Sequence, residues 1–216
     1  MTPSEEDFGE LERLDKFVYL GHCVDESGGF EEAVNHRVQC AWCAFRRLRG
    51  TLVGKHGLSL RQRGFIYCRC VRPVLLYSGE TWSLTANLKQ RLQSTERRMM
   101  RMMCGVRLAD RLPSEELRRR LGIQTDVIEC LETSILRWFG HVRRRKDTHP
   151  IKAAQNFNVT GKRPPGRPKK TWDNTARELM KARRLSEVDA LDRNAWRSMI
   201  QGRPANLSQL GQGGNR

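Results

Sequence analysis

The side chains with the clearest chemical meaning are the cations that follow Trp138. Between His141 and Lys170 the sequence has ten Lys or Arg and one acid, Asp147, so this basic tract carries a net charge of +9. Cations that displace counterions from phosphates bind nucleic acids strongly and in a salt-dependent way. The tract therefore predicts a polyanionic partner, which would be RNA, DNA or an RNA–DNA hybrid. Its candidate contact residues are Arg143, Arg144, Arg145, Lys146, Lys162, Arg163, Arg167, Lys169 and Lys170.

Proline and glycine interrupt the second half of this tract. The segment Pro164–Lys170 reads PPGRPKK, which is similar to the core of an AT-hook, where an extended Gly-Arg-Pro places arginine in the minor groove of A·T-rich DNA. A solvated basic linker that touches phosphates without sequence preference is the alternative interpretation. The first interpretation makes the chain an independent DNA-binding module with an AT-hook-like segment.

Two other patterns could carry chemistry. His36, Cys40 and Cys43 fall on one face of a predicted helix, and a C-x-C pair follows on the next. A structural zinc site needs four ligands, commonly with a paired arm in a turn, so buried thiols are favoured over zinc. His141 has no identifiable nucleophile or carboxylate partner, which favours a structural or phosphate-contacting role over general-base catalysis. We expect no catalytic residue, metal site or cofactor.

Charge is distributed unevenly along the chain. Its 216 residues include 40 Lys or Arg and 24 Asp or Glu, a net charge of +16. Residues 1–58 have seven basic and ten acidic side chains, so residues 59–216 carry the whole excess, 33 against 14. No stretch is apolar enough for a membrane span or a secretory signal. We expect an intracellular protein of the nucleus or cytoplasm, with reduced cysteines and no membrane partner.

Hydrophobic periodicity predicts a mainly α-helical chain. A short β-type run covers residues 17–22, and residues 147–170 are expected to be irregular. The fold class is a helical thumb-like bundle with a small N-terminal β-hairpin, then a basic linker and C-terminal helices. Helices are predicted over residues 30–49, from 59 to about 73, 85–104, 113–121, 125–145, 172–183 and 186–200.

Five blocks of sequence occur in a recognisable order. They are FVYLG (17–21), VRPVLLYSGETW (71–82), LRWFGHVRR (136–144), GKRPPGRPKKTW (161–172) and DRNAWR (192–197). Together they resemble the carboxy-terminal portion of reverse transcriptases from non-LTR (LINE-type) retrotransposons. The resemblance covers roughly residues 14–200.

The resemblance implies roles for several segments. FVYLG would correspond to the primer grip, a β-hairpin that holds the primer end, and would place Tyr19, Leu20 and Gly21 beside the template-primer. The following helices would form the thumb, and the remainder an RNA-binding region. The implied organisation is a disordered acidic N-terminus (1–13), a primer-grip and thumb-like region (14–110), a helical region (111–146), a basic Pro/Gly linker (147–170), C-terminal helices (171–200) and a disordered tail (201–216).

The chain departs from the family in one respect that concerns catalysis. The family's polymerase aspartates precede FVYLG, and the 16 residues that precede it here include Asp7 and Asp15 but no Asp-Asp pair. Two-metal phosphoryl transfer needs carboxylates that converge on both ions. We therefore expect this chain alone to be catalytically inactive, and Mg²⁺ to belong only to the complete parent enzyme.

Overall fold

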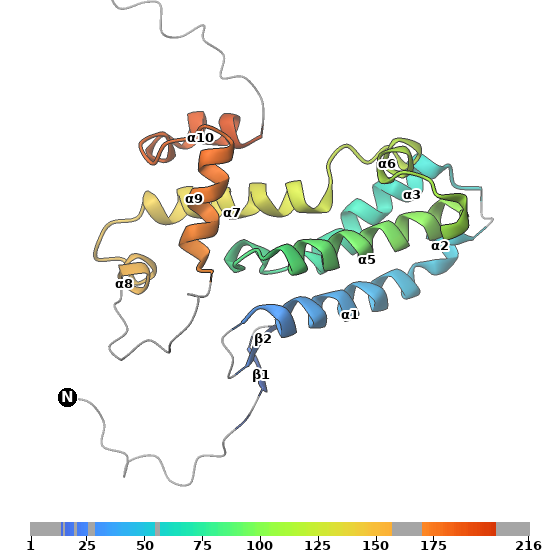
Figure 1. The fold of residues 1–216 in the computed structure, drawn as a ribbon, viewed down its shortest axis with the longest axis horizontal. Helices are drawn as coiled ribbons and strands as arrows, with labels where there is room; N and C mark the ends of the chain where they lie inside the picture. The colour runs from blue at the N-terminus through green and yellow to red at the C-terminus, as the bar shows by residue number, and fades with distance from the viewer. Residues whose placement is uncertain are drawn as a thin grey trace, which may run out of the picture.

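The computed structural model describes residues 14, 16–19, 21–25, 29–54, 57–156 and 170–201, and these are mostly helical (Figure 1). The predicted fold class is confirmed. The elements are β1 (Lys16–Tyr19), β2 (His22–Asp25), α1 (Glu31–Arg47), α2 (Arg49–Val53), α3 (Leu60–Ile66), the π-helical turn η2 (Tyr67–Val71), α4 (Arg72–Leu75), η3 (Gly79–Thr81), α5 (Ala86–Cys104), η4 (Leu108–Asp110), α6 (Ser114–Leu121), α7 (Val127–Arg143), α8 (Pro150–Asn156), α9 (Trp172–Ala182), η5 (Asp189–Leu191) and α10 (Arg193–Ile200).

Helix ends follow the capping chemistry of the sequence. α5 begins after Thr85, whose hydroxyl accepts a hydrogen bond from the Leu88 N–H at 3.4 Å, and ends at Gly105 with a φ of 68°. α7 begins after Asp126, whose carboxylate accepts from the Ile128 N–H at 2.7 Å. Such side chains satisfy N–H groups that the first turn leaves free, and glycine tolerates the left-handed conformation that ends a helix. The predicted helices therefore lie close to the observed ones.

The predicted β element is a hairpin. β1 pairs antiparallel with β2, with Tyr19 opposite His22, and Gly21 lies in the turn with a φ of 77°. The side chains of β1 are exposed. Leu20 lies outside the described residues.

The helix predicted to end near Pro73 instead continues through it. The N–H of Arg72 donates to the carbonyl of Tyr67, five residues back, so the turn before Pro73 is wider than an α-helical one. A proline ring in a regular helix clashes with the carbonyl four residues earlier. The π-helical turn η2 relieves this clash, and α4 follows without a break.

Two predictions about the C-terminal half were wrong. Part of the segment expected to be irregular forms α8, which begins at Pro150, a residue preorganised for the first position of a helix. The helix expected over residues 186–200 is divided, because Asp192 caps a separate α10. Val188 and Leu191, two apolar residues of the predicted helix, are exposed at 73% and 60%.

A single hydrophobic cluster joins the two halves of the described chain. α7 lies along the long axis of the molecule (Figure 1), and α5, η3, α9 and α10 all pack against it. Trp82 and Trp196 are two of the largest buried side chains of the cluster. α7 is therefore the element that positions the C-terminal helices.

A buried ion pair also holds α7 in place. Arg72 donates to Glu96 Oε1 through Nε at 3.0 Å and Nη2 at 2.7 Å. The other oxygen, Oε2, accepts from the backbone N–H of Val127 at the start of α7, at 3.1 Å. Burial opposes the charge of Arg72, but attraction to Glu96 outweighs it and raises the pKa of Arg72. The pair ties α4, α5 and α7 together.

All seven cysteines lie in the described part of the chain, and none of them forms a disulfide. Within the same part, no helix has the length and apolar character needed to cross a membrane.

Candidate nucleic-acid interface

The interface between α7 and α10 is built by two of the sequence blocks described above. Trp196 of α10 is buried and donates its indole N–H to the carbonyl of Leu136 in α7 at 2.9 Å. Gly140 makes this approach possible, because a Cβ there would lie 2.4 Å from Trp196 Nε1. LRWFGHVRR and DRNAWR therefore meet along this contact.

Hydrogen bonds define where α10 begins and attach the segment before it, η5, to the end of α7. Asp192 Oδ1 accepts from the N–H groups of Asn194 and Ala195 at 2.8 and 3.1 Å, which caps α10. From the other side, Arg144 Nη1 donates to the carbonyl of Ala190 at 2.6 Å. The guanidinium of Arg144 is thereby held in one orientation beside α10.

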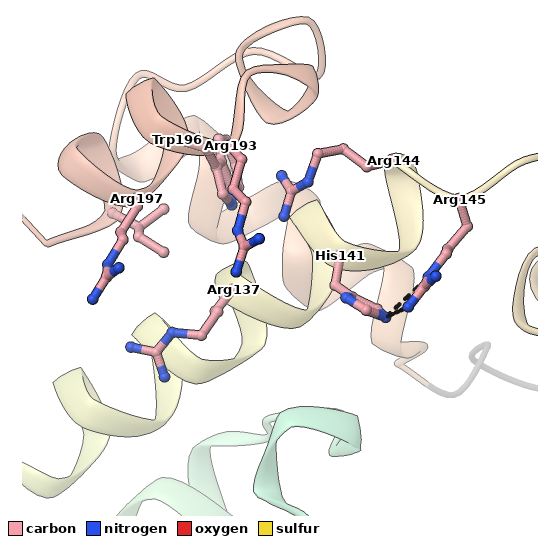
Figure 2. A pocket seen from close by; sticks show the side chains of 8 residues that line it. Arg137, His141, Arg144, Arg145, Arg193, Trp196 and Arg197 are labelled. Carbon is pink, nitrogen blue, oxygen red and sulfur yellow. Dashed lines mark hydrogen bonds between the residues drawn. The ribbon is translucent and has the colours of Figure 1, made fainter.

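This packing creates a strongly basic hollow of about 610 Å³. We call it the arginine pocket. Figure 2 shows Arg193 and Arg197 of α10 facing the side chains of α7. No Asp or Glu among the described residues lines it. Its lining residues are Arg137, His141, Arg144, Arg145, Arg193, Trp196, Arg197 and Ile200.

Burial and, after it, mutual repulsion between cations both oppose positive charge in the pocket. Burial, and then Arg193, lowers the pKa of Arg144. Burial, and then Arg145 and Arg144, lowers the pKa of His141. His141 also accepts a hydrogen bond at Nε2 from Arg145 Nε at 3.2 Å (Figure 2), and its ring stacks on Trp138 with centroids 5.2 Å apart. An anion in the pocket would relieve this repulsion.

Carboxylates near the pocket are engaged elsewhere. Glu187 forms an ion pair with Arg143, whose guanidinium also lies over the ring of Phe139 and does not line the pocket. Asp189 accepts from the backbone N–H of Ser186 at 2.7 Å. These acids therefore do not neutralise the pocket arginines.

The predicted nucleic-acid contacts divide into four groups. Arg144 and Arg145 line the pocket, whereas Lys146 is exposed beyond the end of α7. Arg143 and Lys170 are engaged in ion pairs, Lys170 with Glu178 at 2.6 Å. Lys162, Arg163, Arg167 and Lys169 lie outside the described residues, as does the AT-hook-like segment except for Lys170.

Three pocket arginines were not identified from the sequence. Arg193 and Arg197 are four residues apart on α10, and Arg137 lies one turn before His141 on α7. The spacing of four was a usable signal, because it places residues on one face of a helix. That the two faces meet is a tertiary feature.

Two of the three residues predicted to resemble a primer grip, Tyr19 and Gly21, lie on the hairpin. Tyr19 is 62% exposed, and its ring stacks with that of Phe17 at 6.4 Å between centroids. Gly21 occupies the turn. A role beside a template-primer stays a prediction.

Of the three possible metal ligands on α1, only His36 and Cys40 lie close together. Cys40 Sγ lies 3.6 Å from His36 Nε2. Within the described ranges, no three His, Cys, Asp or Glu side chains are arranged to hold a metal ion.

The chain is similar to a protein of transposon origin. It is 24% identical, over 203 residues, to an uncharacterized transposon-derived protein of Caenorhabditis elegans, a match that covers 89% of this chain and 72% of the relative. No protein-family model matches the chain, and no solved structure is significantly similar to it.

Proposed function

We propose that this transposon-related chain binds RNA, DNA or an RNA–DNA hybrid, and that the arginine pocket is a principal contact. The observation that carries the proposal is the convergence of five arginines from α7, the turn directly after it and α10, without a carboxylate among the described lining residues. Guanidinium groups form paired hydrogen bonds with phosphate oxygens, and they keep their charge at any physiological pH.

We further propose that the chain corresponds to the carboxy-terminal portion of a non-LTR reverse transcriptase. The blocks that carry this resemblance contact one another. Trp172 of GKRPPGRPKKTW donates its indole N–H to the carbonyl of Glu80 in VRPVLLYSGETW at 2.7 Å, and Trp196 of DRNAWR donates to Leu136 of LRWFGHVRR. Blocks that pack together in this way behave as one structural unit, and the similarity to a transposon-derived protein supports the same origin.

In this proposal the chain contributes binding and no chemistry of its own. Polymerisation requires carboxylates that hold two metal ions, and the sequence has no Asp-Asp pair. Purified protein incubated with a primed RNA template, Mg²⁺ and deoxynucleotides should incorporate nothing above background. Metal-dependent incorporation would refute this part of the proposal.

Binding is tested by changing the two exposed pocket arginines of α10. Fluorescence anisotropy with labelled single-stranded RNA, single-stranded DNA and hybrid measures the dissociation constants. The R193S/R197S variant should bind about tenfold or more weakly, since each lost phosphate contact removes a charge-assisted interaction. Circular dichroism checks that the variant is folded.

A matched control separates the pocket from net charge. R119S/R120S removes the same charge from α6, where both arginines are paired with Glu116. This variant should bind nearly as well as the wild type. Equal losses in both variants would show that total charge, and not the pocket, determines the affinity.

A further inference from the structure

The arginine pocket holds more positive charge than one internal phosphate of a strand can balance. Resting on the proposed function, we infer that this pocket receives a phosphorylated end of a nucleic-acid strand, a phosphomonoester, in preference to the phosphodiesters within it. The ligand chemistry is a terminal phosphate carrying nearly two negative charges.

The charge balance is the first argument. Five guanidinium groups line the pocket. An internal phosphodiester brings one negative charge, whereas a phosphomonoester brings about 1.5 to 2 at neutral pH and has three terminal oxygens that accept hydrogen bonds. The phosphomonoester therefore gains more from the same set of donors.

Preorganised donors are the second argument. Arg144 is held by the carbonyl of Ala190 at 2.6 Å, and Arg145 is held by His141, with Nη2 3.0 Å from the imidazole Nε2. Each guanidinium has five N–H groups, so further donors remain for a ligand. Because these side chains are already ordered, binding costs less conformational entropy than it would at free surface arginines.

The shape of the pocket is the third argument. The buried side chains of Trp196 and Ile200 line the hollow, while Arg137, Arg193 and Arg197 are exposed. Its volume of about 610 Å³ lies within the range of small-ligand pockets, about 300 to 1,000 Å³. There is room for a terminal phosphate together with part of its sugar.

The test compares one single-stranded oligonucleotide with three different ends. Anisotropy measures binding of the hydroxyl-ended, 5′-phosphorylated and 3′-phosphorylated forms. At least one phosphorylated form should bind about tenfold tighter than the hydroxyl-ended form. The R193S/R197S variant should lose this preference, and R119S/R120S should keep it.

Two competitors distinguish a strand end from a free phosphate. Inorganic phosphate and a nucleoside monophosphate should displace the phosphorylated strand only at concentrations about a hundredfold above its dissociation constant, because neither makes the backbone contacts that accompany the end. If the mononucleotide binds as tightly as the phosphorylated strand, the assignment to strand ends is overturned.

The remaining outcomes separate this inference from the function it rests on. Equal affinity for all three ends, in a protein that does bind them, overturns the inference alone. Failure to bind any oligonucleotide at low salt overturns both the inference and the proposed function.

Discussion

Glu96 is a buried carboxylate whose two oxygens accept four hydrogen bonds. Arg72 provides two, and the others come from the hydroxyl of Tyr67 at 3.1 Å and the N–H of Val127 at 3.1 Å. Burial, and then the charge of Glu96, raises the pKa of Tyr67 well above its usual value, so the phenol remains a donor. Removal of this carboxylate charge would leave Arg72 buried beside a neutral group.

The first prediction concerns Glu96→Gln. We expect a loss of about 3 to 5 kcal/mol in the free energy of unfolding, because breaking a buried ion pair leaves the other charge uncompensated. Urea denaturation followed by circular dichroism measures it. Glu116→Gln is the control, since Glu116 pairs with exposed Arg119 on the surface of α6. A loss in Glu96→Gln no larger than that of the control would contradict the prediction.

The second prediction concerns the pH dependence that His141 adds to stability. Its pKa is lowered in the folded protein, so as pH falls the unfolded chain takes up this proton first. The stability contributed by neutral His141 is present above about pH 6.5, the usual pKa of histidine, and is lost as the pH falls below it.

His141→Gln removes this contribution. Melting temperatures recorded from pH 7.5 to pH 5 should fall less steeply for the variant than for the wild type. Phosphate added at pH 5.5 should restore part of the wild-type loss, because an anion in the pocket favours the protonated imidazole. Parallel pH profiles for the two proteins would count against a lowered pKa.

At the scale of elements, the contact between α7 and α10 decides whether the pocket exists. It depends on Gly140 and Trp196, which touch closely enough that a Cβ at position 140 would meet the indole. Trp196 cannot move aside to make room for a Cβ, because its side chain is 1% exposed and hydrogen-bonded to Leu136.

The third prediction is that Gly140→Ala destabilises the protein by about 1 to 3 kcal/mol through overpacking, in spite of the better helix propensity of alanine. Displacing α10 should also weaken oligonucleotide binding. Gly50→Ala is the matched control, since Gly50 lies in α2 and a Cβ there would meet no atom within 4 Å. That control should be neutral or slightly stabilising. Similar melting curves for both variants would refute the proposed role of Gly140.

At the scale of the whole molecule, charged residues are distributed unevenly along the chain. The excess of +16 arises entirely from residues 59–216, which include every element that lines the pocket. A protein of this kind approaches a polyanion with its basic part foremost, and its affinity depends on counterion release.

The fourth prediction follows from counterion release. Affinity for a single strand should fall at least about tenfold between 50 and 200 mM salt, and the slope of log K against log salt should be shallower in R193S/R197S by about 1.4, two contacts at 0.7 each. Anisotropy at four salt concentrations measures the slope. If the double substitution left the slope unchanged, the phosphates of the strand would have to contact another part of the surface.

Local sequence was enough to predict most helices. The apolar residues of α1, α5 and α7 recur every three or four positions, and their ends carry side chains such as Thr85, Asp126 and Gly105 that act within a few residues. Interactions between residues so close in the sequence can be predicted from the sequence alone. The interruption at Asp192 was missed because Ser186 and Asp189 have the spacing of a helix N-terminus. They do form reciprocal hydrogen bonds, but these close a short turn instead of starting a long helix.

The sequence by itself determined that this protein is mainly helical and basic, since periodicity, capping and charge are properties of neighbouring residues. Only the tertiary structure decided which cations act together. Arg137 and Arg193 are 56 positions apart, and they share one pocket because Gly140 admits Trp196 against α7. Arg143, adjacent to Arg144 in sequence, turns instead to Glu187, because successive side chains on a helix point in different directions.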